Sequence, residues 1–285
     1  MGAGYLYTSL GNDRVFGKAH AAFLFIDIPF SSKVKKLYSN YRIGFGVSYL
    51  TRQFDVSENP LNLAISSGLN IYVNFKYNVR FRIDKKNEVL AGIGFSHFSN
   101  GKLATPNLGI NTVTVSLGYL YNIMPARYPR QTPEIKPSLK KNTIEFILTG
   151  GAKTDDQISG KYYFISSFIM DYKFVPGMKY SFGAGVDFFY DESLGPNKVG
   201  DEGGNYTSSD LFQIGLHGAF YTRYSKLNIV LQVGSYVHAN YYKYTRVYSR
   251  IGFRYEIYHN ILLNLSLKAH RAIADYMEWG IGYRF

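Results

Sequence analysis

The chain has 285 residues and no cysteine, which excludes disulfide scaffolds, Cys-ligated metal centres and thiol nucleophiles. Its formal net charge is +12, which suggests an anionic partner such as a lipid phosphate surface. The basic residues are scattered through strand-like segments and form no blocks, so we expect no nucleic-acid partner.

The composition favours a β-rich protein. Aromatic residues make up 17% of the chain, and there are 28 glycines. No stretch of about 18 uncharged apolar residues is present, which excludes a membrane-spanning helix. At this length, one large β-domain covering residues 1–285 is the expected organisation.

Alternation of apolar and polar residues is the strongest signal along the chain. Between Ile71 and Ile83, every odd position is apolar or aromatic, and every even position is polar or tyrosine. Similar alternation predicts about fourteen strands, with twelve as the alternative: 3–9, 20–30, 40–51, 63–83, 87–99, 111–123, 142–151, 160–174, 177–191, 208–223, 226–238, 245–257, 259–271 and 276–285.

The lengths of these runs indicate a membrane protein. Several reach about ten residues, enough for a tilted strand to cross a bilayer. One face is apolar and the other small and polar, which is typical of a transmembrane antiparallel β-barrel of the outer-membrane type. A large soluble β-protein, whose strands are usually about 5–6 residues long, is the alternative.

The lengths of the connections between strands predict how the barrel is oriented in the membrane. Short turns are expected at 84–87, 175–177 and 224–225, and they would be periplasmic. Longer stretches at 52–62, 100–110 and 191–207 would be extracellular loops. The Pro-containing segment 124–141 falls on the periplasmic side and departs from this rule.

The final segment alternates as well. Met277, Trp279, Ile281, Tyr283 and Phe285 share one face. This pattern resembles the C-terminal strand that outer-membrane proteins present to their assembly machinery, which makes that machinery an expected partner through Phe285. The start of the sequence has no signal-peptide pattern, so we expect it to represent a mature form of an exported protein.

One strand end carries residues that could take part in catalysis. His97 and Ser99 share the predicted lipid-facing side of strand 87–99, where polar groups are costly. Side chains two apart in a strand are neighbours, so a histidine base could reach a serine hydroxyl. Alternatively, both residues lie at the membrane–water interface, where polarity is tolerated. The six histidines have no metal-binding spacing, and we expect neither a metal nor a cofactor.

The segment that begins at His97 is more specific. His97-Phe98-Ser99-Asn100-Gly101-Lys102, followed by Pro106-Asn107-Leu108-Gly109, resembles the active-site segment of PagL-type lipid A 3-O-deacylases and of the larger acyloxyacyl hydrolase family barrels. Residues 59–67 also look similar to the larger relatives. The resemblance covers roughly residues 1–125, and the rest of the chain shares only barrel character.

The resemblance implies a role for each site residue. Ser99 would be the nucleophile and His97 its general base. The Asn107 side chain, with the backbone N–H groups after Ser99 at Asn100 and Gly101, would hold the oxyanion. Two interpretations of Lys102 stay open: contact with lipid A phosphates, or a solvated loop charge. Asn111 stands where the smaller enzymes have an acidic residue that orients the histidine. It is therefore the expected third residue of a catalytic triad with Ser99 and His97, although Asn is atypical in this place.

The sequence therefore predicts a serine esterase in the outer membrane of a Gram-negative bacterium. It would remove an ester-linked acyl chain, at the 3-position, from lipid A in the external leaflet, with lipopolysaccharide and membrane lipids as its partners. A phospholipase is a subsidiary possibility. The alternatives are a porin whose basic lumen carries anionic solutes, and a structural barrel with an inactive motif. The expected basic lumen residues are Arg42, Lys76, Arg80 and Arg82.

Overall fold

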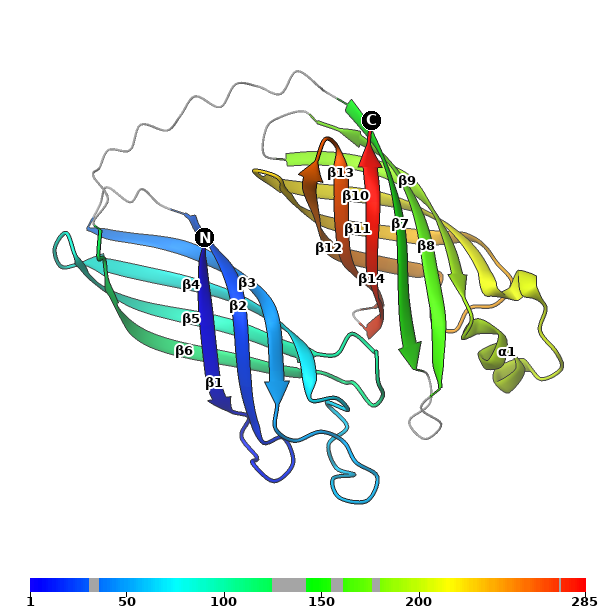
Figure 1. The fold of residues 1–285 in the computed structure, drawn as a ribbon, viewed down its shortest axis with the longest axis horizontal. Coiled ribbons are helices and arrows are strands. Elements are labelled where there is room, and N and C mark those ends of the chain that lie inside the picture. Colours follow the sequence, from blue (N-terminus) through cyan, green and yellow to red (C-terminus); the bar gives the residue numbers. More distant parts are fainter. Residues whose placement is uncertain (31–35, 125–141, 155–160, 176–179, 272) are drawn as a thin grey trace. The chain divides into compact units, whose positions relative to one another are not determined.

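The structure is a computed structural model that describes residues 1–30, 36–124, 142–154, 161–175, 180–271 and 273–285. It has two compact units (Figure 1). The first comprises Met1–Asn100 and Pro106–Glu134, and the second comprises Gly101–Thr105 and Ile135–Phe285. Within the described part of the chain, none of the helices has the length and apolar content that a membrane crossing needs.

The first unit is a six-stranded antiparallel sheet in which each strand pairs with the next along the chain. Within the described residues, the outermost strands each pair on one side only. The six strands are β1 (Gly2–Ser9), β2 (Lys18–Pro29), β3 (Leu37–Leu50), β4 (Leu69–Arg82), β5 (Asn87–Ser99) and β6 (Ile110–Tyr121).

The second unit is a closed eight-stranded antiparallel barrel. A short α-helix, α1 (Leu194–Glu202), and a 3₁₀-turn, η1 (Ser208–Leu211), lie between two of its strands. The strands are β7 (Asn142–Thr154), β8 (Tyr162–Phe174), β9 (Tyr180–Asp191), β10 (Phe212–Tyr224), β11 (Leu227–Ala239), β12 (Val247–Tyr258), β13 (Ile261–His270) and β14 (Ile273–Arg284).

The described residues form fourteen antiparallel strands, which confirms the prediction of about fourteen, but the prediction that they form one barrel is wrong. The last strand turns back onto β7, with 279–284 of β14 paired to 145–150 of β7. This pairing closes β7–β14 and leaves β1–β6 as a separate sheet. A barrel of eight strands is also narrow enough for side chains to fill its interior. The chain divides into two compact units, and the assignment of residues 1–285 to a single domain stays a prediction.

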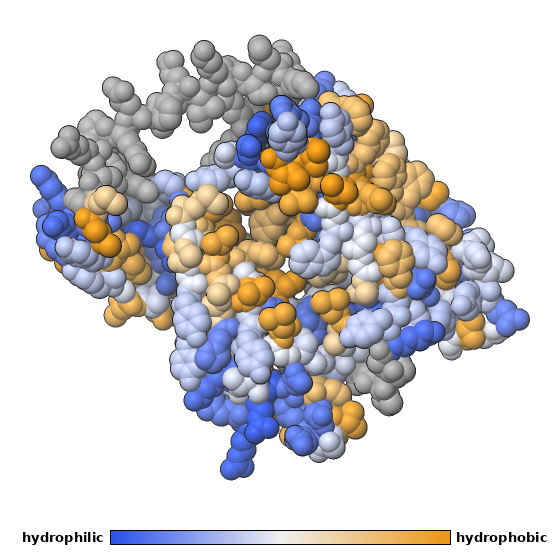
Figure 2. Space-filling view, in the orientation of Figure 1, coloured by the Kyte–Doolittle hydropathy of each residue, from blue (hydrophilic) through white to orange (hydrophobic). Residues whose placement is uncertain are grey.

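Both sheets expose one apolar face, as the alternation predicts. Figure 2 shows apolar side chains at the surface over the eight-stranded barrel. Because the side-chain period of a strand is two, this face and the polar face come from alternate positions of the same strands. Exposed apolar residues include Ile93, Val115 and Leu117 of the first unit, and Leu148, Phe188, Leu216, Leu263, Trp279 and Ile281 of the barrel.

Buried ion pairs fill the interior of the barrel. His217 is enclosed between Asp171 (2.6 Å) and Asp187 (2.7 Å). Arg250 contacts Glu278 at 2.6 Å, and Arg254 also donates to Asp171. Each buried charge therefore has an oppositely charged partner, as burial away from water requires.

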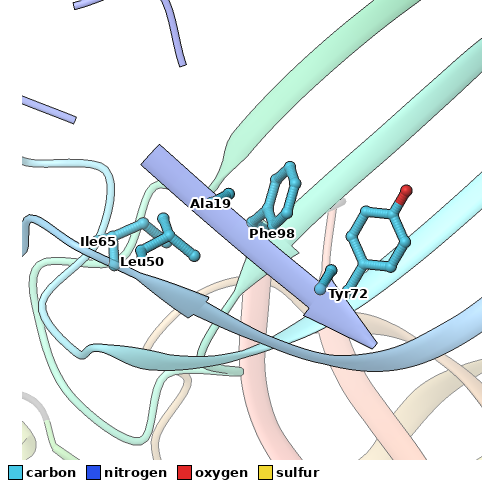
Figure 3. Close-up of a cluster of buried hydrophobic side chains, with 6 residues drawn as sticks. Ala19, Leu50, Ile65, Tyr72 and Phe98 are labelled. Carbon is cyan, nitrogen blue, oxygen red and sulfur yellow. The ribbon is translucent and has the colours of Figure 1, made fainter. Parts of the chain in front are cut away.

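The first unit has a small apolar core at one end of its sheet. Ile65 comes from the loop before β4, whereas Ala19, Leu50, Tyr72 and Phe98 come from four strands (Figure 3). Phe98 is fully buried in this cluster. Because neighbours in a strand point to opposite faces, burial of Phe98 turns His97 and Ser99 to the other side of the sheet.

Candidate active site

The candidate site is built on the paired ends of β5 and β6. In the register of these strands, His97 lies directly opposite Asn111. His97 Nδ1 is 2.6 Å from Asn111 Oδ1. A ring nitrogen that donates a proton to an amide oxygen must carry that proton, so Nε2 is left as the acceptor of the neutral imidazole. In this arrangement, Nε2 is the ring nitrogen that can accept a proton.

Gly109 allows the loop to pass close to the histidine ring. Its φ is +75°, a conformation that favours glycine. A Cβ atom at this position would lie 2.8 Å from His97 Cε1. Any side chain at Gly109 would therefore displace the ring or the loop.

The Ser99 side chain is buried, with the residue 8% exposed. Asn107 donates a hydrogen bond from Nδ2 to Ser99 Oγ at 2.9 Å. The Asn107 Oδ1 atom in turn accepts the backbone N–H of Asn100 at 3.2 Å. Asn100 thus fixes which end of the Asn107 amide faces the serine, and an N–H donor is placed beside the hydroxyl.

A buried asparagine holds the loop that packs on the site. Asn62 donates through Nδ2 to the carbonyls of Val15 (3.0 Å) and Arg52 (3.2 Å), and its Oδ1 accepts the N–H of Ile65 (3.2 Å). The segment that follows Asn62 then receives the site loop. Leu108 N–H donates to Leu63 O (3.3 Å), and Gly109 N–H donates to Ala64 O (2.9 Å).

A second asparagine and an aspartate stabilise the turn that precedes Asn62. Asn59 donates to the carbonyls of Val15 and Gln53 at 2.9 and 2.8 Å. The Ser57 hydroxyl and the backbone N–H groups of Glu58 and Ser57 hold the pKa of Asp55 below its ordinary value. The segment 55–65 is therefore a hydrogen-bonded support for the site loop.

An apolar hollow of about 530 Å³ lies on the same face of the sheet as His97. Phe95 precedes His97 by two positions in β5, and Val113 follows Asn111 by two in β6, so both share that face. The hollow extends from these residues across β4 and β3, where it is lined by Ile43, Phe75, Tyr77 and Tyr41. An apolar hollow of this size suits a ligand with a hydrocarbon chain.

The structure brings together five of the seven residues that the sequence proposed: His97, Ser99, Asn100, Asn107 and Asn111. Gly101 and Lys102 are grouped with the second unit. There, Lys102 donates a hydrogen bond to the Tyr244 hydroxyl, and its Nζ lies 5.0 Å from the centre of the Tyr244 ring.

Sequence reasoning missed two supports of the site. Asn62 lies in the segment whose similarity to larger relatives was noticed, but that similarity carried no structural role. Gly109 is part of the motif, but its close approach to His97 was not predicted. Its place two residues after Asn107 and just before a strand is the signal that could have found it.

The fold and this geometry indicate the class of protein: an all-β, barrel-forming protein with a serine and a histidine at a strand end. Two family models match the chain. The model described as "Lipid A 3-O-deacylase (PagL)" covers residues 2–120, and that described as "Acyloxyacyl hydrolase, C-terminal domain" covers residues 142–285. The chain belongs to the PagL family of lipid A deacylases.

The second model corrects the sequence interpretation. The resemblance was expected to end near residue 125, but the matched region continues to Phe285. Both sheets thus correspond to the family, which is one of β-barrel hydrolases associated with lipid A, lipopolysaccharide and the outer membrane.

Comparison with curated proteins gave no match. Among solved structures, a de novo designed transmembrane β-barrel matches with a TM-score of 0.34 and 10% identity, over 52% of this chain and 99% of the design. The FrpB iron transporter from Neisseria meningitidis matches with a TM-score of 0.20 and 7% identity, over 94% of this chain and 55% of the transporter.

Proposed function

We propose that the protein is a serine esterase that removes the 3-O-linked acyl chain of lipid A in the external leaflet of the outer membrane. The observation that carries this proposal is the pair of contacts at the strand ends: Asn111 on His97, and Asn107 on Ser99. One contact orients a base, and the other places a donor beside the nucleophile.

The first chemical step is attack by the serine. His97 Nε2 accepts the proton of the Ser99 hydroxyl while Oγ bonds to the ester carbonyl carbon. Negative charge then develops on the carbonyl oxygen. The Asn107 N–H, already beside Ser99 Oγ, would donate to that oxygen, with Asn100 holding the Asn107 amide in place.

Collapse of this intermediate releases the sugar hydroxyl, which takes its proton from the His97 imidazolium. The acyl chain stays on Ser99 as an ester. Water, deprotonated by His97, then attacks this ester and releases a fatty acid and free Ser99. Asn111 keeps the His97 ring in one orientation through both steps.

The apolar hollow supports a lipid substrate. It begins two residues from His97 on the face that the alternation assigns to lipid. An acyl chain already in the bilayer could lie in the hollow without leaving an apolar environment. Lys102, in the loop after Ser99, is proposed to meet lipid A phosphates. We also propose that the outer-membrane assembly machinery recognises the strand that ends in Phe285.

No observation favours the porin alternative. Two of the four expected lumen cations, Arg42 and Arg80, pair with Asp27 at 2.8 Å, and Arg82 lies 3.4 Å from Glu88. The interior of the eight-stranded barrel is occupied by ion pairs.

Mass spectrometry of lipid A, before and after incubation with the purified protein, tests the proposal. We expect loss of one 3-O-linked acyl chain with the native protein and none with Ser99→Ala. Unchanged lipid A with the native protein, or equal deacylation by Ser99→Ala, would contradict it.

A further inference from the structure

A polar cavity of about 180 Å³ lies at one end of the eight-stranded barrel. This end carries the two-residue connections between β10 and β11 and between β12 and β13. The cavity is lined by the first residues of some strands and the last residues of others, among them Thr143 of β7, Lys173 of β8 and Arg284 of β14. Because a single water needs about 10–15 Å³, the cavity has room for a polyatomic ligand.

The charged residues that line the cavity are mostly basic. Lys173, Arg223 and Arg284 line it together with one carboxylate, that of Glu256. Arg284 Nη1 donates to Glu256 at 2.7 Å. Glu145, which is buried near the lining, contacts Arg284 and Arg254 at 2.8 Å and Lys173 at 3.7 Å. Three lining cations therefore face two carboxylates, Glu256 and Glu145, which leaves one net positive charge.

Two buried donors in the cavity wall lack partners among the described residues. They are the hydroxyl of Thr143, a residue only 8% exposed, and Nη2 of Arg284. Buried polar groups without partners are rare in folded proteins, and each one calls for a ligand, an ion or water. Here both groups belong to the wall of one positively charged cavity.

We propose that this cavity binds a phosphate-type oxyanion. Arg223 and Arg284 offer the planar donor groups that match phosphate oxygens, Lys173 supplies a point charge, and the Thr143 hydroxyl supplies a further donor. Free phosphate and the phosphoryl group of a lipid headgroup present the same chemistry. The anion would connect strands from opposite sides of the barrel and stabilise it by binding only the folded form. The site is separate from the serine and histidine of the first unit.

The test is a titration of the full-length protein, folded in a detergent without phosphate. One arm uses inorganic phosphate and the other uses dihexanoyl phosphatidic acid below its micelle concentration, each followed by calorimetry. Arg223→Gln and Thr143→Val remove lining groups. The matched control is Arg246→Gln, which removes the same charge from the connection between β11 and β12 and leaves the cavity intact. The electrophoretic shift between boiled and unboiled samples verifies folding of every variant.

We expect saturable one-to-one binding by the native protein and by Arg246→Gln. Arg223→Gln should weaken it about tenfold, as expected for the loss of one charge-assisted hydrogen bond. Thr143→Val should weaken it less, and Glu256→Gln should tighten it by removing the competing carboxylate. Binding of phosphate alone identifies a free anion, and binding of the short-chain lipid alone identifies a headgroup. Failure of both to saturate, or equal affinity in Arg223→Gln and the native protein, would overturn the proposal.

Discussion

Asn107 donates a hydrogen bond from its amide nitrogen to the Ser99 hydroxyl, with 2.9 Å between Nδ2 and Oγ. The orientation of this amide is set from its other end, where Oδ1 accepts the Asn100 N–H. An N–H donor is thus held beside the atom that would attack the ester. In a serine esterase, a donor in this place stabilises the oxyanion that forms next to the nucleophile.

The first prediction concerns this donor. Asn107→Ala should lower kcat by about 10²–10³, the usual cost of one oxyanion donor, with little change in KM. Asn107→Asp should be at least as poor, because it keeps the acceptor for Asn100 but adds a repulsive charge. Steady-state hydrolysis of a short-chain soluble ester measures both, with Asn87→Ala, at the opposite end of β5, as control. Full activity of Asn107→Ala would show that the oxyanion is held elsewhere.

The second prediction concerns the nucleophile and the base. Ser99→Ala should abolish acyl release, and His97→Ala should nearly abolish it, because one bears the attacking atom and the other accepts its proton. Lipid A mass spectrometry provides the measurement. Ser116→Ala on β6 and His20→Ala on β2 make the same changes elsewhere in the sheet and should leave turnover intact. Near-native turnover in either site variant would rule out the mechanism.

The third prediction concerns solubility. The protein should remain monodisperse only in detergent or lipid, because both sheets expose a continuous apolar face. Light scattering during removal of detergent should show aggregation. A folded, monodisperse protein in plain buffer would contradict a membrane location.

The fourth prediction concerns the buried support of the site. Asn62→Ala removes two donors and one acceptor, and leaves the carbonyls of Val15 and Arg52 without that partner. We expect faster hydrogen exchange in residues 62–66 and a fall of about tenfold in kcat/KM, equivalent to about 1.4 kcal/mol and within the cost of unpaired buried groups. Asn122→Ala, at the other end of the sheet, is the control. Unchanged exchange and unchanged activity would show that the loop holds its place without Asn62.

Alternation predicts the strands well where one face is apolar throughout. β5 has the bounds that the sequence gives, 87–99, because nothing interrupts its period of two. β4 begins at Leu69 rather than near residue 63, because the apolar Leu63-Ala64-Ile65 run belongs to a loop anchored by Asn62. Local pattern cannot distinguish such an anchored loop from the start of a strand.

The closure of the barrel could not be predicted from the same pattern. Pairing of β14 with β7 joins residues more than a hundred positions apart, whereas alternation specifies faces and not partners. The site was more accessible to sequence reasoning. His97, Ser99 and Asn111 are placed by the register of one hairpin, so their common face follows from counting. The contact between Asn107 and Asn100 depends on loop geometry that no period describes.

The last prediction concerns Asn111, the one departure from the acidic residue of the smaller enzymes. Its Oδ1 lies 2.6 Å from His97 Nδ1, so it can orient the ring as a carboxylate would. A neutral amide stabilises the imidazolium less than a carboxylate does, which predicts a slow enzyme. Asn111→Ala should lower turnover by roughly tenfold to a thousandfold, within the range of an acid–base contribution.

Asn111→Glu should preserve or raise turnover, because it restores a charge next to the histidine. Thr112→Ala, the next residue on the opposite face of β6, controls for damage to the strand. Single-turnover acyl release from lipid A separates the chemical step from substrate binding. If Asn111→Ala keeps native turnover, the 2.6 Å contact is structural and His97 needs no third residue; if Asn111→Glu is inactive, the amide is required for more than orientation.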